Sequence, residues 1–293
     1  MKTLGVILAG GKSSRFYPTT LSVTKQLLPI YDKPLIYYPL STLMLAKIKD
    51  ILIITSETES DIFKRLFHNH NLGINLHFAT QSRPKGIAEA IKIASLYFGD
   101  NIKKYNRTCL ILGDNLFYGA GLTGELNKAK KSKFPVVFAI KVKDPERFGV
   151  VELKDFDEDF KSCLSIEEKP TSPKSNLAVT GLYFYPNDVY GYVDKLKPSS
   201  RNELEITDLN KIYQKKEELK VIKLFRGITW FDTGTFDSMI EASNFVQTIQ
   251  KQQDILIGSP HEVAYNNNWI SKQQLLETAA NFNNSYGLYL SNL

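Results

Sequence analysis

The chain has 293 residues, of which 43% are hydrophobic and 23% are charged, and its formal net charge at pH 7 is +6. This composition is that of an ordinary globular protein, and it excludes an intrinsically disordered chain, a fibrous repeat and a small disulfide scaffold. No run approaches the roughly 18 consecutive apolar residues that a membrane helix requires, so the sequence predicts no membrane span.

The first half of the chain alternates strand-like runs with helical patterns. Short apolar runs bounded by Gly, Asn or Asp predict strands at 4–9, 51–55, 75–80 and 108–112. Helices are predicted at 61–70 and at 87–98, where apolar residues recur at three- and four-residue spacing. This alternation indicates βαβ units, and hence an α/β fold whose parallel sheet is covered by helices on both faces.

The second half has a different order of predicted elements, with little helix between its strands. Strands are predicted at 134–142, 149–153, 163–168 and 178–185. We expect them to add antiparallel strands to the sheet and to build one wall of a cleft.

Two helices are predicted near the C-terminus. Thr235 is a plausible N-cap for a helix through Gln250, and five apolar residues are expected on one face of that helix: Phe236, Met239, Ile240, Val246 and Ile249. A second helix is predicted near 271–280 within a polar tail. The organisation is therefore one mixed domain over 1–250, followed by a helical appendage at 251–293.

The first predicted strand leads into Gly10, Gly11 and Arg15. Paired glycines let the backbone approach a phosphate closely, and their N–H groups can bind the anion. Lys25 follows in the next loop and can reach the same phosphate. Neither the Walker A pattern nor GxGxxG is present, so a tight turn and a solvated lysine remain alternatives.

Two aspartates end predicted strands. Asp114 follows the strand at 108–112, and Asp232 precedes the helix that Thr235 caps. In an open α/β sheet, ligands bind at the carboxyl ends of the strands. Two carboxylates together with substrate phosphate oxygens are a common set of ligands for Mg²⁺, although each aspartate alone is also typical of a turn or a helix cap.

Acidic and basic groups meet again at the end of the strand at 163–168. Pro170 stops the strand, so Glu168 and Lys169 are expected to point to opposite faces. Arg201 is a further candidate for an anion clamp. Surface ion pairing is the alternative for all three residues.

Features that are missing also restrict the chemistry. The four histidines form no convincing metal spacing, and the sequence contains no GxSxG motif and no Cys–His pairing. Covalent and acid–base catalysis are therefore poorly supported. Phosphoryl-type transfer needs neither, because it relies on positioning and charge neutralisation.

Cysteine usage and charge suggest the compartment and the partners. Cys109 and Cys163 belong to no CxxC motif and are expected to be core residues of a reduced, cytoplasmic protein. The positive charge suits anionic partners, but the lysine-rich stretch at 128–133 lacks any recognition-helix or aromatic RNA-binding pattern. We therefore expect small phosphorylated ligands, with neither nucleic acid nor a membrane as partner.

Over nearly its whole length the sequence resembles the sugar nucleotidylyltransferases, and among them those that transfer thymidylyl groups to glucose 1-phosphate. The matching stretches are, in order, GVILAGG, TKQLLPIYDKPLIYYPLSTLMLA, LGDNLFYG, DPERFGVVE, EEKPTSPKSN, AVTGLYFY, NELEITD and DTGTFDS.

The resemblance implies a fold, a reaction and an assembly. The fold is the Rossmann-like nucleotidyltransferase fold, with a mixed, mostly parallel sheet and extra strands that form the sugar-binding wall. Its nucleotide-binding part covers about 1–133 and its sugar-binding part about 134–250. The reaction converts dTTP and α-D-glucose 1-phosphate into dTDP-glucose and pyrophosphate with Mg²⁺, and usually feeds the synthesis of deoxysugars, such as dTDP-rhamnose, for surface polysaccharides including lipopolysaccharide. Members of the family are typically homotetramers.

The resemblance also implies roles for matching residues. Those implied at the reacting phosphates are Arg15, Lys25, Lys169 and Arg201. Those implied to bind the nucleotide are Gly10, Gly11, Gln26, Gln81 and Gly86, with Gln81 and Gly86 reading the thymine edge. Those implied to line the glucose pocket are Gly149, Glu168 and Val179. Asp114 and Asp232 are implied to bind Mg²⁺.

Five positions depart from the family pattern. Ser13 and Ser14 replace the usual Gly-Thr of the glycine loop, Lys85 replaces an aspartate, Phe148 replaces a tyrosine, and Asn266 stands where an arginine is usual. A side chain at position 13 is strained if the loop needs a positive φ there. These changes leave two alternatives open: the same chemistry on another sugar 1-phosphate or nucleotide, and a weakly active paralogue that binds nucleotide sugars.

Overall fold

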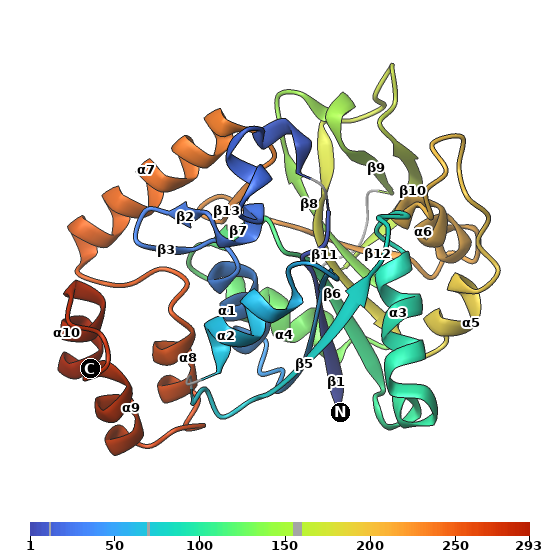
Figure 1. Ribbon diagram of the computed structural model, residues 1–293. Coiled ribbons are helices and arrows are strands. Elements are labelled where there is room, and N and C mark those ends of the chain that lie inside the picture. The colour runs from blue at the N-terminus through green and yellow to red at the C-terminus, as the bar shows by residue number, and fades with distance from the viewer. Residues whose placement is uncertain (12, 69–70, 155–159) are drawn as a thin grey trace.

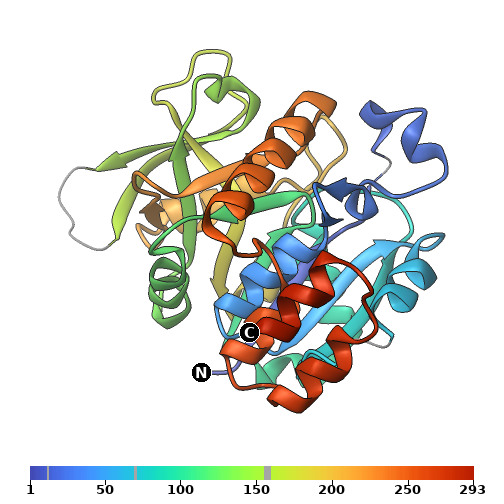
Figure 2. The same ribbon diagram turned by 90° about the vertical axis from the view of Figure 1, so that its left-hand side faces the viewer.

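A computed structural model describes residues 1–11, 13–68, 71–154 and 160–293. Its centre is a nine-stranded sheet in the order β5-β4-β1-β6-β11-β8-β12-β10-β9 (Figures 1 and 2). These strands are β1 (Thr3–Leu8), β4 (Asp50–Ser56), β5 (Asn75–Gln81), β6 (Arg107–Leu112), β8 (Val136–Lys141), β9 (Gly149–Lys154), β10 (Lys161–Glu168), β11 (Leu177–Pro186) and β12 (Lys220–Lys223). Two small sheets lie outside it, formed by β2 (Pro29–Ile30) with β3 (Lys33–Pro34) and by β7 (Asn115–Tyr118) with β13 (Thr229–Asp232).

Helices cover both faces of the central sheet. They are α1 (Tyr37–Leu45), α2 (Ser60–Phe67), α3 (Glu89–Phe98), α4 (Leu122–Lys131), α5 (Val189–Val193), α6 (Ile206–Lys215), α7 (Phe236–Gln253), α8 (Pro260–Asn266), α9 (Lys272–Ala279) and α10 (Ser285–Asn292). In Figure 1, α3, α5 and α6 lie on one side of the sheet and α1, α2 and α4 on the other. The predicted mixed α/β architecture is confirmed.

Alternation along β1 and β4 explains the two cores. Successive side chains of a strand point to opposite faces. Ile7 and Ile53 accordingly enter the core beneath α1, α2 and α4, whereas Val6 and Leu52 enter the core beneath α3, α5 and α6. Both faces of these strands are apolar because both are covered, as in other parallel sheets.

The direction of the strands changes in the second half of the chain, where the sequence predicts strands with little helix between them. β5, β4, β1 and β6 are parallel, whereas β11 runs antiparallel to β6 and to β8. β9 and β10 form an antiparallel pair, and β9 also contacts β11. The predicted wall of added strands is therefore confirmed.

Some elements differ from the predictions. The predicted helix at 61–70 ends at Phe67, and residues 69–70 lie outside the described ranges. Thr235 caps α7 in a capping box with Ser238, as predicted, but the apolar face of α7 is only partly buried. Met239 and Val246 are buried, whereas Phe236 and Ile240 remain 45% and 58% exposed. Both exposed side chains line a separate open cavity that they share with Leu28 and Pro29.

The C-terminal helices pack on the main domain. Residues of α8, α9 and α10 belong to the same core as α1 and α2, and the three helices lie at the lower left in Figure 1. Gln250, in the last turn of α7, fixes the chain as it turns back. Its amide accepts hydrogen bonds from Lys33 Nζ (3.0 Å) and from the Ile257 backbone (2.9 Å), and it donates to Asp32 (3.0 Å).

Both cysteines are buried and unbridged, as predicted for core residues. Burial raises the pKa of the Cys109 thiol well above its ordinary value and that of Cys163 to about 12. Within the described ranges, no helix combines the length and the hydrophobicity needed to cross a membrane.

Candidate active site

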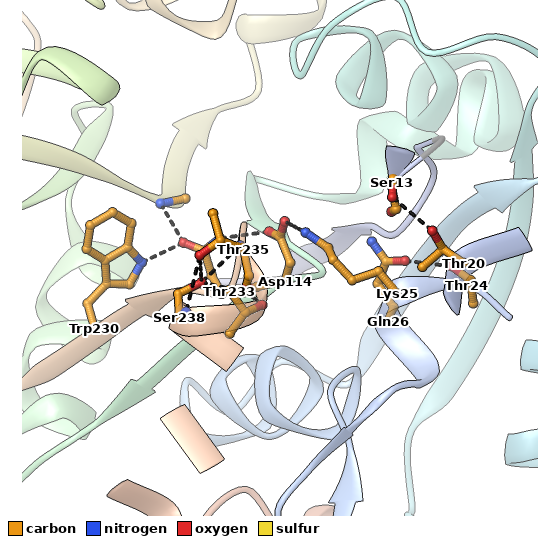
Figure 3. Close-up of polar contacts among 12 residues, drawn as sticks. Ser13, Thr20, Thr24, Lys25, Gln26, Asp114, Trp230, Thr233, Thr235 and Ser238 are labelled. Atoms are coloured by element: carbon orange, nitrogen blue, oxygen red, sulfur yellow. Dashed lines mark hydrogen bonds and ion pairs between the residues drawn. The ribbon is translucent and has the colours of Figure 1, made fainter. Parts of the chain in front are cut away.

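A short two-stranded ribbon brings the two predicted metal-binding aspartates together. β6 ends at Leu112, and Asp114 stands just before β7, which pairs antiparallel with β13. In this register Asp232 lies opposite Asn115, the neighbour of Asp114. The Thr233 backbone and hydroxyl both donate to the Asp114 carbonyl, at 3.2 and 2.8 Å, and lock the ribbon at this point (Figure 3).

The two carboxylates have opposite electrostatic environments. Burial disfavours the charged form of Asp114, but the Lys25 ammonium and a hydrogen bond from Asn115 Nδ2 (2.9 Å) outweigh it, so its pKa is lowered. Figure 3 shows Lys25 reaching directly to Asp114. Burial and then the charge of Asp114 raise the pKa of Asp232 to about 6.

These residues fit a magnesium ion. Asp232 accepts no side-chain hydrogen bond from the residues that the structure describes, so both of its oxygens keep free lone pairs beside a second carboxylate. Its raised pKa reports the uncompensated negative charge that a cation would relieve. Within the described ranges, no third His, Cys, Asp or Glu completes a metal cluster. Mg²⁺ commonly binds one or two carboxylates and completes its shell with water and phosphate oxygens.

A cavity of about 480 Å³ opens in front of this pair. The predicted residues that line it are Gly10, Gly11, Arg15, Lys25, Gln26, Asp114 and Asp232. Gly10 and Gly11 follow β1, so this cavity lies at the carboxyl end of the parallel strands, where ligands bind in α/β folds. Lys25 and Gln26 are buried, and Thr24 holds the Gln26 amide by donating to its Oε1 at 2.7 Å. Lys12, between Gly11 and Ser13, lies outside the described residues.

Ser13 adopts the left-handed conformation that the sequence identified as a source of strain. Its φ and ψ are 45° and 36°, and its carbonyl accepts hydrogen bonds from Thr20 Oγ1 and the Phe16 backbone, both at 2.9 Å. The loop therefore needs a backbone geometry that favours glycine.

We expect Ser13→Gly to stabilise the protein. Left-handed geometry costs an L-residue roughly 1–2 kcal/mol, and the greater freedom of glycine in the unfolded chain offsets part of that gain. A rise in melting temperature of about 1–3 °C by differential scanning fluorimetry is expected. Ser14→Gly is the matched control, because φ is not positive at Ser14 and glycine there should lower the melting temperature. A less stable Ser13→Gly variant would contradict the prediction.

A larger cavity of about 870 Å³ adjoins the first and shares Arg15 and Asp232 with it. The three predicted sugar-binding residues meet in its wall, since a Cβ on Gly149 would lie 3.4 Å from Glu168 Oε2 and 3.8 Å from the Val179 Cβ. Thr207 holds the Glu168 carboxylate with a hydrogen bond of 2.5 Å. Phe148 packs edge-on against Trp230, with ring centroids 5.2 Å apart, and both line this cavity.

The prediction that Glu168 and Lys169 face opposite ways is wrong, because both line the larger cavity. β10 ends at Glu168, and Lys169 takes a φ of 44°, so the alternation of the strand is broken between them.

Arg201 lies to one side of the two joined cavities. It borders a third cavity of about 310 Å³ that shares Glu168 and Lys169 with the larger one. Its guanidinium pairs with Glu205 at 2.9 Å and with Glu168 at 3.5 Å. To reach a substrate phosphate, Arg201 would have to exchange these carboxylates for it.

Gln81 and Gly86 lie behind the smaller cavity rather than in its wall. Gln81 is the last residue of β5 and is 5% exposed. Gly86 has a φ of 100°, and a Cβ there would lie 2.4 Å from the Leu204 carbonyl oxygen, so the loop tolerates only glycine.

The sequence did not single out several residues that complete the site. Asn115 Oδ1 accepts hydrogen bonds from the Trp230 indole (2.6 Å) and from the Gly181 backbone (3.1 Å), which orients its amide toward Asp114. Arg147, Asp237 and Glu241 line the larger cavity. Asn115 directly follows Asp114, so its place in the Gly-Asp-Asn run was the available signal.

Comparisons with known proteins agree with this geometry. A family model described as "Nucleotidyl transferase" matches residues 4–249. The chain is 50% identical to a glucose-1-phosphate thymidylyltransferase of Neisseria meningitidis serogroup A, over 99% of this chain and 98% of that protein. It is 46% identical to one from Mycolicibacterium smegmatis, with the same shares covered.

Solved structures show the same likeness. A candidate glucose-1-phosphate thymidylyltransferase from Bacillus anthracis, crystallised with a sucrose, matches with a TM-score of 0.72 and 35% identity, over 83% of this chain and 94% of that one. A UDP-glucose pyrophosphorylase complexed with UDP-glucose matches with a TM-score of 0.74 and 25% identity, over 85% of this chain and 100% of that one.

Proposed function

This chain belongs to the nucleotidyl transferase family, and on that premise we propose that it transfers the thymidylyl group of dTTP to α-D-glucose 1-phosphate. The products are dTDP-glucose and pyrophosphate. The single observation that carries this proposal is the pair of joined cavities. One has a glycine loop and two carboxylates, the other has a polar wall suited to a sugar, and Arg15 and Asp232 stand between them.

The reaction is an in-line displacement at the α-phosphorus of dTTP. A phosphate oxygen of glucose 1-phosphate forms the new P–O bond, and the bond to the β,γ-pyrophosphate group breaks. No residue needs to remove a proton, because a phosphate monoester has a second pKa of about 6 and is largely ionised at neutral pH. Catalysis therefore consists of positioning and of stabilising negative charge.

Each residue of the site would take one part in positioning the substrates or in stabilising negative charge. The Gly10 and Gly11 backbones would hold the nucleotide phosphates, and Arg15 would neutralise charge where the two cavities meet. Lys25 and Lys169 would contact the reacting phosphates from opposite sides. Glu168, held by Thr207, would accept hydrogen bonds from sugar hydroxyls. Asp114 and Asp232 would hold Mg²⁺, which would neutralise phosphate charge and polarise the bond to the leaving group.

The wider context rests on the family resemblance. We propose that the enzyme is cytoplasmic and homotetrameric, that it acts on small molecules rather than nucleic acid, and that dTDP-glucose serves deoxysugar and surface polysaccharide synthesis. Light scattering coupled to size-exclusion chromatography tests the tetramer.

We expect purified protein to release pyrophosphate from dTTP only when glucose 1-phosphate and Mg²⁺ are both present. Asp114→Asn is the control and should release at least about a hundredfold less, because it removes a metal ligand and the partner of Lys25. Absence of release above this control would refute the proposal.

The uridylyl reaction is the second candidate, because a UDP-glucose pyrophosphorylase is among the structural neighbours. A panel of dTTP, UTP, CTP, GTP and ATP, each with several sugar 1-phosphates, separates the two. A clear preference for UTP or for another sugar would replace the proposed substrates while leaving the chemistry intact. If no triphosphate gave pyrophosphate release, although the protein still bound dTTP or dTDP-glucose, the result would favour a weakly active paralogue.

A further inference from the structure

Glu89 holds the amide of Gln81 from behind the smaller cavity. Glu89 is the first residue of α3, and its Oε2 accepts hydrogen bonds from Gln81 Nε2 and from the Lys85 backbone (3.1 Å). An ionised carboxylate can only accept hydrogen bonds. The atom of Gln81 that faces Glu89 must therefore be the NH₂ group, and the amide cannot flip without losing this bond.

The opposite end of the amide faces the glycine loop. A Cβ on Gly10 would lie 2.9 Å from Gln81 Oε1, so the missing side chain of Gly10 leaves room in front of that oxygen. Gly10 lines the smaller cavity. Gln81 Oε1 accepts no hydrogen bond from the part of the chain that the structure describes. This amide oxygen thus remains available for a donor that enters from the cavity side.

We propose that Glu89 is a specificity-determining positioning residue, which fixes Gln81 as a hydrogen-bond acceptor and so selects a base that carries an N–H at the recognised edge. This inference rests on the proposed function and on the role that the family resemblance implies for Gln81, which is to read the base. Thymine and uracil present N3–H, a donor, between two carbonyl oxygens. Cytosine presents an unprotonated N3, an acceptor, beside an amino group.

Cytosine does not match this acceptor. Its N3 would face Gln81 Oε1, so two acceptors would stand opposite each other. Unpaired polar groups in a desolvated site cost more than a formed hydrogen bond gains. A freely rotating Gln81 would relieve the mismatch by presenting its NH₂ group. The hydrogen bond to Glu89 prevents this rotation.

The test compares Glu89→Met with wild type, using kcat/KM for dTTP and dCTP and equilibrium binding of each nucleotide without sugar phosphate. Methionine fills similar space and accepts only weakly, so both orientations of Gln81 become populated. Activity with dTTP should fall only about twofold, because roughly half of the molecules keep the productive orientation. Activity and binding with dCTP should rise at least about tenfold. A gain with the wrong nucleotide distinguishes this role from a general loss of folded protein, which would lower activity with both nucleotides.

Two further variants sharpen the test. Glu89→Gln can still accept both hydrogen bonds through its own Oε1, so the preference for dTTP should stay within about threefold of wild type. Glu125→Met is the matched control, since Glu125 also lies in the first turn of a helix, pairs with Lys128 and lines neither cavity. Its nucleotide preference should not change.

A Glu89→Met variant with an unchanged ratio of dTTP to dCTP activity would overturn the inference. If activity also fell equally with both nucleotides, Glu89 would be a merely structural residue. Failure of the proposed function looks different, because wild-type protein would then show no turnover of dTTP at all. In that case the two binding constants still report whether Glu89 sets the base preference.

Discussion

Replacing Lys25 with methionine is expected to lower kcat/KM for dTTP by about 10²–10³-fold. Lys25 is buried, pairs with Asp114 and lines the smaller cavity, with its ammonium 5.4 Å from the centre of the Phe16 ring. Methionine keeps the length and the apolar stem but removes the charge. The site then loses a cation for the reacting phosphates, and Asp114 stands uncompensated beside Asp232.

The same substitution should also destabilise the protein, which has to be separated from the chemical effect. Breaking a buried ion pair by removing one partner typically costs about 3–5 kcal/mol, because it leaves an unpaired buried charge. The double variant Lys25→Met with Asp114→Asn removes both charges and should recover most of the free energy of unfolding, measured by urea denaturation. Its activity should stay as low as that of the single variant.

Recovery of stability in the double variant would show that the unpaired charge of Asp114 destabilises Lys25→Met. The chemical effect is then read from kcat/KM of Lys25→Met itself, measured at a temperature where this variant stays folded. A Lys25→Met enzyme that keeps more than about a tenth of wild-type kcat/KM would contradict the role proposed for the residue.

The sequence predicted the central strands well because their signals are local. β1 and β4 are short apolar runs bounded by turn residues, and they occur within a residue or two of the expected positions. α1 escaped prediction because it is buried on every side, from Tyr37 to Met44, and so lacks the polar face that reveals an amphipathic helix. A hydrophobic run of that length has no periodicity to distinguish it from a strand.

The site was predicted in its parts more than in its arrangement. Asp114 and Asp232 stood out as carboxylates at strand ends, but the ribbon that joins them consists of two four-residue strands far apart in sequence. Glu168 and Lys169 were expected on opposite faces because strand alternation was extended one residue too far, into a left-handed position. Glu89 carries no motif, and only its contact with Gln81 across eight residues reveals a role.

Asp232→Asn is expected to make the protein more stable and nearly inactive. Burial and the neighbouring Asp114 raise the pKa of Asp232 from an ordinary 3.8 to about 6. Between these two values the folded state holds a proton that the unfolded state has lost. The free energy of unfolding therefore falls as pH rises through this window, and above pH 6 the full penalty of about 3 kcal/mol is present. Asparagine has no charge to bury and escapes it.

The measurement is the difference in urea-unfolding free energy between Asp232→Asn and wild type, at pH 8 and at pH 4. The variant should be more stable by about 1–3 kcal/mol at pH 8 and by less than about 1 kcal/mol at pH 4, where the folded-state carboxyl is protonated and the unfolded-state carboxyl is partly protonated. Asp100→Asn, at an exposed position paired with Lys103, is the control and should bring no gain in stability at pH 8.

The activity of Asp232→Asn should fall although its stability rises. Without the Asp232 carboxylate, binding of Mn²⁺ as a spectroscopic substitute for Mg²⁺ should weaken at least about tenfold, and pyrophosphate release should fall with it. A variant that is both destabilised at pH 8 and unchanged in metal affinity would contradict the assignment. The gain in stability and the loss of metal binding have one cause. The buried charge of Asp232 destabilises the folded protein when no cation is bound, and a bound cation would neutralise that same charge.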